Sequence, residues 1–161
     1  NSQDNLTSCI AMIYDVNANG DPNTVKQDIR TMNAPVLGST CTDYAAGFCI
    51  AYVEPQNCET DDECINYMKQ YCIDTGMVLS SQAQLTAVTD ALGINYMMEL
   101  GEKYGKRRFY TYERPNSSLA VCYAYSTSGQ TPTSQISAYC SSNYGAPVKN
   151  GIGVCVKAES N

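Results

Sequence analysis

The stretch "CIAYVE", residues 49–54, has two near copies along the chain: "CIAMIY" begins at Cys9 and "CYAYST" begins at Cys122. Each run is short, opens on cysteine and carries alanine two positions later. Because side chains alternate between the faces of a β-strand, the cysteine and the alanine would share one face. The pattern therefore predicts three strands on which a helix can pack closely over the small alanine. The alternative is chance similarity among short buried strands, and in either case the pattern describes scaffold, not chemistry.

Apolar periodicity and capping signals predict the other elements. Strands are expected over 8–16, 47–54, 107–113, 119–126 and 152–158, with a turn at 114–118. Helices are expected from Asp21–Pro22 to about Met32, after the T-x-x-E capping box that opens at Thr60, and between the similar signature at Ser81 and Gly93. A helical turn within 94–100 and a short helix within 131–145 complete the prediction.

Strand-like and helix-like segments are mixed along the chain, which favours the α+β class. We expect a disulfide-stapled, mainly antiparallel sheet with short amphipathic helices packed on it. The length of 161 residues suits one domain with a real core. Residues 1–161 are therefore predicted to form a single secreted disulfide-rich domain, and a division into two lobes near 101–106 stays open.

Nine cysteines and no histidine exclude the Cys/His zinc families and indicate disulfides in an oxidising compartment. We therefore predict a secreted, extracellular protein. A strand cysteine bridged to the helix that packs over it would form a mechanically sensible unit, but the sequence leaves the disulfide connectivity open. Nine is odd, so four bridges leave one cysteine that is either buried and inert or paired with another chain. The disulfide candidates are Cys9, Cys41, Cys49, Cys58, Cys64, Cys72, Cys122, Cys140 and Cys155.

The sequence also bears on membranes and glycans. No apolar run approaches the roughly 20 residues that a membrane helix needs, so membrane insertion is not expected. The first residues lack the features of a signal peptide, which would then have been removed already. Asn5 and Asn116 begin N-x-[ST] sequons and are candidate glycosylation sites in a eukaryotic secretory pathway.

Charge is spread unevenly along the chain. The net charge of −6 argues against nucleic acid as a partner. Acidic residues dominate between Glu54 and Asp74, whereas half of the ten positive charges lie between Lys103 and Arg114. Acidic and basic surfaces on one molecule would allow a heterologous contact between copies, which builds rings or filaments.

The segment "EKYGKRRFYTYER", residues 102–114, is the candidate binding site. On a strand, Arg108, Tyr110 and Tyr112 would share one face. Such a face could bind a sulfate, an anionic glycan or the acidic side of a protein through charge-assisted hydrogen bonds. The alternative is an edge strand whose cations discourage accidental pairing. The predicted binding residues are Lys106, Arg107, Arg108, Tyr110, Tyr112 and Arg114.

A second motif resembles the opening of a calcium loop. Asp15, Asn17, Asn19 and Gly20 match D-x-[DN]-x-[DN]-G, but Lys26 stands where the loop needs its closing acid. We therefore interpret it as a turn that leads into a capped helix, and we expect neither a metal nor a cofactor.

Catalysis has little support in the sequence. Without histidine there is no Ser-His or Cys-His nucleophile, and neither a phosphate-binding glycine loop nor a dinucleotide motif is present. A carboxylate pair of the glycosidase type stays formally open, with Glu54, Glu99, Glu102 and Glu113 as candidates. We expect the protein not to be an enzyme.

Three hypotheses follow for function. The first is a non-enzymatic extracellular protein that works by protein contact, with copies of itself as the partner, as a subunit of an assembly or filament or as a surface module. Thirteen tyrosines suit such contacts, although they equally suit a small core with a wet rim. The second is a soluble binder or effector that holds a protein or anionic glycan through the basic-aromatic strand. The third is a carboxylate-based hydrolase of extracellular polysaccharide.

Overall fold

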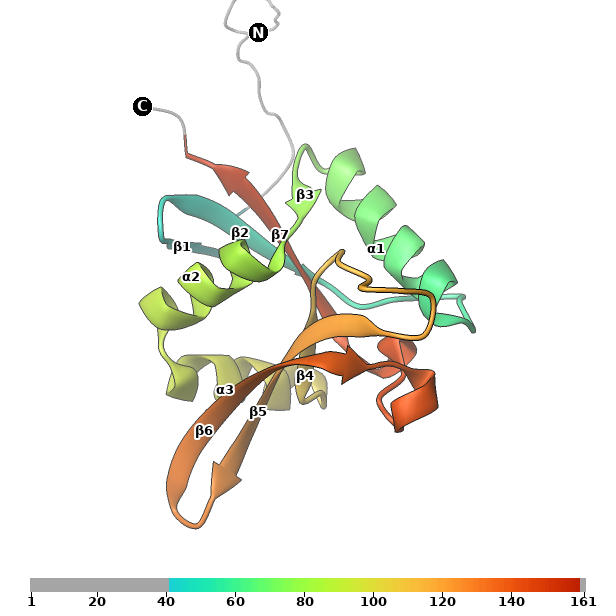
Figure 1. The fold of residues 1–161 in the computed structure, drawn as a ribbon. Coiled ribbons are helices and arrows are strands. Elements are labelled where there is room, and N and C mark those ends of the chain that lie inside the picture. The colour runs from blue at the N-terminus through green and yellow to red at the C-terminus, as the bar shows by residue number, and fades with distance from the viewer. Residues whose placement is uncertain (1–40, 160–161) are drawn as a thin grey trace, which may run out of the picture. The chain divides into compact units, whose positions relative to one another are not determined.

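Seven strands form one mixed, mostly antiparallel sheet in the computed structural model, which describes residues 41–159 (Figure 1). The strands are β1 (Asp43–Ala45), β2 (Phe48–Val53), β3 (Val78–Leu79), β4 (Arg108–Tyr110), β5 (Ala120–Ser128), β6 (Thr131–Cys140) and β7 (Ile152–Ala158). The helices are α1 (Asp61–Asp74), α2 (Gln82–Leu92) and α3 (Ile94–Tyr104), with two 3-10 turns, η2 (Ser142–Tyr144) and η3 (Val148–Asn150). The α+β prediction is confirmed.

The strand order across the sheet is β1-β2-β7-β4-β5-β6. The short strand β3 also pairs with β7 but is not part of this order. The pair of β4 and β7 is parallel, and the other pairs are antiparallel. The last strand in sequence, β7, therefore lies near the middle of the sheet. The hairpin of β5 and β6 lies at one edge and extends beyond the helices (Figure 1).

Local capping signals place the helices where the sequence predicts them. The Thr60 hydroxyl accepts from the Glu63 N–H at 3.1 Å, and the Glu63 carboxylate accepts from the Thr60 N–H at 3.1 Å. The Ser81 hydroxyl and the Gln84 side chain make the same exchange at the start of α2. α2 ends at Gly93, whose φ of 93° suits glycine.

The helix predicted within 131–145 is wrong, because Thr131–Cys140 is strand β6. The pairing of Ser128 with Thr131 leaves Gly129 and Gln130 as a two-residue turn, and Gly129 has the positive φ of 60° that such a turn requires at its first position. Two other elements differ in length. α3 is a full helix where a single turn was expected, and β4 is shorter than the predicted strand 107–113.

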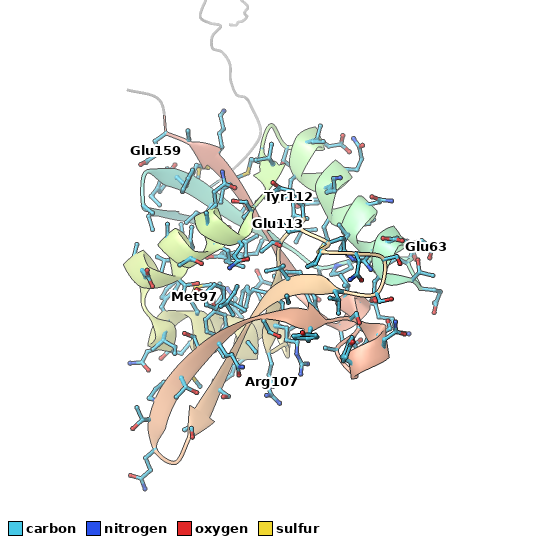
Figure 2. The ribbon with its side chains drawn as sticks, in the orientation of Figure 1. Glu63, Met97, Arg107, Tyr112, Glu113 and Glu159 are labelled. Carbon is cyan, nitrogen blue, oxygen red and sulfur yellow. A yellow bond between two sulfur atoms is a disulfide. The ribbon has the colours of Figure 1, made fainter. Side chains whose placement is uncertain are left out.

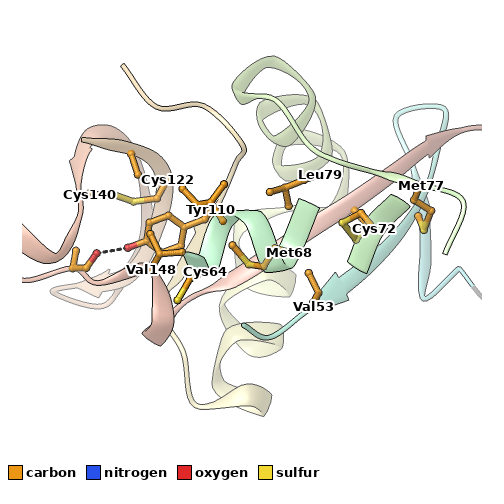
Figure 3. Packing of buried hydrophobic residues seen from close by; sticks show 14 of the residues in the cluster. Val53, Cys64, Met68, Cys72, Met77, Leu79, Tyr110, Cys122, Cys140 and Val148 are labelled. Carbon is orange, nitrogen blue, oxygen red and sulfur yellow. Dashed lines mark hydrogen bonds between the residues drawn. A yellow bond between two sulfur atoms is a disulfide. The ribbon is translucent and has the colours of Figure 1, made fainter. Parts of the chain in front are cut away.

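One face of the sheet is covered by α1 and by the disulfides (Figure 3). Met68 of α1 is fully buried and lies so close to Gly153 of β7 that a Cβ on this glycine would come within 2.7 Å of the Met68 sulfur. Cys49 and Ala51 both belong to this face, as the Cys-x-Ala pattern predicts. We name it the cysteine face, because all eight cysteines between 41 and 159 lie in it or pack against it.

The opposite face of the sheet is covered by α2 and α3. Leu85 and Val88 of α2 and Met97 of α3 are fully buried against it. Phe109 lies at its centre and meets Tyr125 edge to face with ring centroids 5.2 Å apart. We name this surface the aromatic face, and among the described residues no cysteine belongs to its core.

Four disulfides join the eight described cysteines: Cys41–Cys49, Cys58–Cys64, Cys72–Cys155 and Cys122–Cys140. The unit in which a strand cysteine bridges to the helix packed over it does not form at Cys49, which pairs with the earlier Cys41, or at Cys122, whose partner is in the neighbouring strand. One bridge does join a helix to a strand, between α1 and β7. Because these eight pair with one another, Cys9 is the odd cysteine of the nine.

Several predictions lie outside the described residues: the strand 8–16, the helix ending near Met32, the loop at Asp15 and the sequon at Asn5. Residues from Cys41 onward form one compact unit, and 101–106, which includes the end of α3 and the turn that follows it, falls inside this unit. The prediction of a single domain over 1–161 reaches beyond this unit and stays a prediction.

Candidate functional site

The predicted basic-aromatic segment does not form one continuous surface. β4 lies between β7 and β5, so the interpretation as an edge strand is wrong. Tyr110 is fully buried on the cysteine face, where its hydroxyl donates to the Ala146 carbonyl at 2.5 Å, and burial raises the pKa of this hydroxyl. Arg108, on the same strand, is half-buried. Tyr110 therefore supports the core and is not available to a ligand.

Arg114 binds its own loop. Its guanidinium donates to the carbonyls of Leu119 at 2.5 Å and Ser117 at 2.8 Å, and it also pairs with the Asp62 carboxylate of α1. Its side chain is only 15% exposed. The residue thus ties the 114–119 loop to the start of α1, and part of the acidic cluster already has its cation within the same chain.

Lys106 and Arg107 line a hollow of about 220 Å³ between α3 and β5. Arg107 is exposed, and its backbone carbonyl accepts from the Tyr125 N–H at 3.2 Å. The hollow is lined by Met97, Met98, Gly101, Glu102, Lys106, Arg107, Phe109, Tyr125, Ser126 and Thr127. It combines two cations with an apolar floor.

Tyr112 lies apart from Arg107, as Figure 2 shows, and lines a second hollow of about 450 Å³. Three exposed apolar side chains meet there: Ile73, Val78 and Tyr112 itself. Lys69 is the one charged residue among the described residues that line it. The predicted binding residues are thus divided between two hollows, the core and a loop anchor.

The carboxylates proposed for glycosidase chemistry do not converge. The Glu113 carboxylate accepts from the Gln82 N–H at 2.7 Å, at the start of α2. Among the described residues that line the hollow at Lys106 and Arg107, Glu102 is the one acidic side chain. Glu54 and Glu99 line neither this hollow nor the one at Tyr112. Acid–base hydrolysis of a glycoside needs two carboxyl groups across one bond, and the described hollows do not offer that arrangement.

Two carboxylates that the sequence analysis did not single out hold elements together. Asp43 of β1 accepts from the hydroxyls of Tyr52 at 2.8 Å and Tyr96 of α3 at 2.6 Å. The hydrogen bond to Asp43, together with partial burial, raises the pKa of Tyr96 to about 12. These contacts join residues far apart in sequence, so local patterns carry no signal for them.

Asp61, the first residue of α1, holds the loop after β6. Its carboxylate accepts from the Ser142 N–H at 2.8 Å, the Ser142 hydroxyl at 2.9 Å and the Val148 N–H at 3.0 Å. Partial burial opposes ionisation, but these hydrogen bonds outweigh it and hold the pKa of Asp61 below its ordinary value. The carboxylate therefore has a structural role.

The long free edge of β6 is the most distinctive feature of the described surface. The two-residue turn makes Ser128 and Thr131 a hydrogen-bonded pair, so alternate residues from Thr131 direct their backbone groups to β5. Ser134 and Ile136 then direct their N–H and C=O groups to the open side. The Tyr125 N–H donates to the backbone carbonyl of Arg107, the residue before β4, and so points away from β6, which agrees with this alternation.

The edge carries few of the devices that normally prevent edge-to-edge pairing. Pro132 stands where an outward N–H would lie, and a bulge opposite 120–122 interrupts the ladder near Tyr139. Between these two points the register is unbroken. No charged residue occurs anywhere in 115–148, so β6 has no lysine or arginine that would disfavour pairing with another strand.

Two exposed tyrosines lie where β6 ends. Tyr139 and Tyr144 are 65% and 54% exposed, and their rings meet edge to face with centroids 5.6 Å apart. Such rings bring large contact area at low entropic cost, which suits an interface. They extend the uncharged strand into an uncharged aromatic patch.

Within residues 41–159 no group of three or more metal-ligating side chains comes together, and none of the described helices is long and apolar enough to cross a membrane. Asn116 is exposed, and its side chain accepts from the Ser118 N–H at 2.8 Å in the loop before β5. A glycan at Asn116 stays a prediction.

No known family, curated protein or solved structure matches this chain.

Proposed function

We propose that the chain is a non-enzymatic extracellular protein whose copies associate by strand addition at the free β6 edge. The observation that carries the proposal is the edge itself: an uncharged strand of ten residues with outward backbone groups at Ser134 and Ile136. An added strand satisfies those groups, and its alternate side chains supply further contact. Four disulfides suit an oxidising compartment, and one of them, Cys122–Cys140, ties β6 to β5.

The β6 edge is a better candidate for the contact between copies than the acidic and basic surfaces are. Asp62 is paired with Arg114, and Glu59 lies 3.7 Å from Lys149 in the same chain. These internal contacts reduce the charge that the acidic cluster offers to another copy. Pairing at β6 buries no charge, and therefore carries no ionic desolvation cost.

Sedimentation velocity over a range of protein concentrations tests the proposal. The wild-type chain should associate, and Ser134→Pro should weaken association at least tenfold because proline removes an outward N–H and places its ring at the edge. Ser134→Ala keeps the N–H and is the matched control, expected to associate like wild type. Circular dichroism and the intact mass of the oxidised protein would check that both variants are folded with four disulfides.

Salt distinguishes the edge from charged patches. Strand pairing without charges should change less than about twofold between 50 and 500 mM salt, whereas contact between acidic and basic surfaces should weaken strongly. A wild-type chain that remains monomeric at high concentration and low salt would overturn the proposal. So would a folded Ser134→Pro variant that associates as well as Ser134→Ala.

The hollow at Lys106 and Arg107 supports a second candidate function, the binding of an anionic glycan. Two cations above an apolar floor suit a sulfate or carboxylate carried on a sugar ring. A sulfated oligosaccharide is the probe, with affinity measured by calorimetry. Arg107→Glu should lower affinity more than tenfold, and Lys157→Glu, which makes the same charge change at an exposed position near the end of β7, should not. Equal losses would assign binding to net charge alone.

A further inference from the structure

We infer that the strand added at the β6 edge is the segment 8–16 of a second copy of this chain. The inference rests on the proposed function and names its partner. It commits to a head-to-tail contact in which each copy donates one segment and accepts another at β6.

Two of the three Cys-x-Ala runs are strands in the structure. Cys49 lies in β2 and Cys122 lies in β5, and both cysteines are buried. The third run, "CIAMIY" from Cys9, has the same order of cysteine, alanine and large apolar residues. A segment whose two sequence counterparts are sheet strands is suited to pair as a strand itself.

The charge pattern of the donor matches that of the acceptor. Residues 5–14 are uncharged and lie between Asp4 and Asp15, and residues 115–148, which include the whole of β6, are uncharged as well. A donor with a charge in its centre would have to desolvate it against the hairpin. The free edge at β6 in the described part of the chain thus fits residues 8–14 of this segment without an ionic cost, and Asp15 lies at the segment's end.

The length of chain before β1 is sufficient for the donor segment to reach a second copy. The described chain begins at Cys41 and enters β1, which is one end of the sheet order, while β6 is the other end. The two edges are five strand spacings apart, about 24 Å at roughly 4.8 Å each. The residues 17–40, between the donor segment and Cys41, can span about 80 Å when extended. A donor segment that pairs with a different acceptor strand gives a heterologous contact, which builds rings or filaments.

Complementation between two variants of the full chain tests the inference. The donor variant carries Ala11→Pro and Met12→Pro; neighbouring N–H groups point to opposite sides of a strand, so one of the two must face β6. The acceptor variant is Ser134→Pro. Each variant alone should be a monomer of 17.5 kDa, and a mixture of equal amounts should form a dimer and stop there, because each dimer has one intact donor and one intact edge.

Two controls accompany the mixture in sedimentation velocity. Asn17→Pro with Ala18→Pro places the same two prolines just beyond the segment, and this variant should associate like wild type. Cys9→Ser removes the odd cysteine, and its association should persist, which separates strand pairing from a disulfide between chains.

The outcomes distinguish the inference from the proposed function. If wild type does not associate, the proposed function fails. If the donor variant still associates while Ser134→Pro does not, β6 pairs with something else, such as β6 of another copy, and only the inference is overturned. A mixture of the two monomeric variants that forms no dimer would also overturn it.

Discussion

The two faces of the sheet are stabilised by different means. The aromatic face has two helices, and its core is built from aliphatic and aromatic side chains with no cysteine among the described residues. The cysteine face has one helix of 14 residues and all four disulfides. On the cysteine face, covalent links add to the packing of α1, and they stabilise the fold mainly by restricting the unfolded chain.

The two faces also differ in the side chains that lie between the helices and the sheet. On the cysteine face, Met68 lies against Gly153. The side chains of Val53 and Leu79 lie beside it and leave no room for a side chain on this glycine. On the aromatic face, the rings of Tyr123 and Tyr125 stack with centroids 5.8 Å apart beneath α2 and α3. Small residues and disulfides thus stabilise one face of the sheet, whereas large aromatic side chains stabilise the other.

Removal of the longest disulfide should have the largest effect. The bridge Cys72–Cys155 spans 83 residues, so replacing both cysteines by alanine should lower the free energy of unfolding by about 4 to 5 kcal/mol. The same replacement of Cys58–Cys64, which spans 6 residues, should cost only about 2 kcal/mol. Guanidinium unfolding without reductant measures both. Equal losses would show that loop length does not determine the contribution of the disulfides on this face.

A cavity on the aromatic face should cost somewhat less. Leu85 of α2 is fully buried, and Leu85→Ala should lower the free energy of unfolding by about 3 kcal/mol. Gln82→Ala on the exposed side of the same helix should change it by less than about 0.5 kcal/mol. If the two faces are independent, the losses from Leu85→Ala and from removal of Cys72–Cys155 should add. A combined loss that departs from the sum by more than about 1 kcal/mol would show that the faces are coupled.

The smallest effect is expected at Asp61, which anchors the loop after β6 to the cysteine face. Asp61→Ala removes three hydrogen bonds and should cost about 2 kcal/mol at pH 7. The pKa of Asp61 is lowered in the folded chain from its ordinary 3.8, so its contribution is complete above that pH and is lost as the pH falls through the folded pKa.

The difference between wild type and Asp61→Ala should therefore shrink below about pH 4, in urea unfolding curves recorded at several pH values. Asp90→Ala, at an exposed position of α2, is the comparison variant and should change stability by less than about 0.5 kcal/mol. A difference between wild type and Asp61→Ala that stays constant down to pH 2 would contradict the role of the ionised carboxylate.

Predictions from sequence succeeded where the controlling interaction is local. The capping boxes at Thr60 and Ser81 connect residues three apart, and both helices begin there. Alternation placed Cys49 and Ala51 on one face of a strand. The helix predicted within 131–145 was wrong because serine, threonine and glutamine residues can occur in a helix or in a strand. Pairing with β5 makes this segment a strand.

The binding segment shows the same limit at the level of the site. Its basic and aromatic residues were grouped because they are close in sequence, yet the parallel pairing of β4 with β7 puts Tyr110 in the core and leaves Arg107 at a hollow. The free edge of β6 was not predicted, although the uncharged run 115–148 is a signal for it that can be read from the sequence.

By itself, the sequence determined the α+β class, the capped helices, the pattern of buried strands and the oxidising compartment, because periodicity, caps and cysteine content act over a few residues or through composition alone. The tertiary structure decided which cysteines pair, which strand lies at the edge and which cations are already neutralised. Those outcomes depend on contacts between residues as far apart as Cys72 and Cys155 or Asp61 and Val148. Such contacts form only when the whole sheet assembles, and no local pattern specifies them.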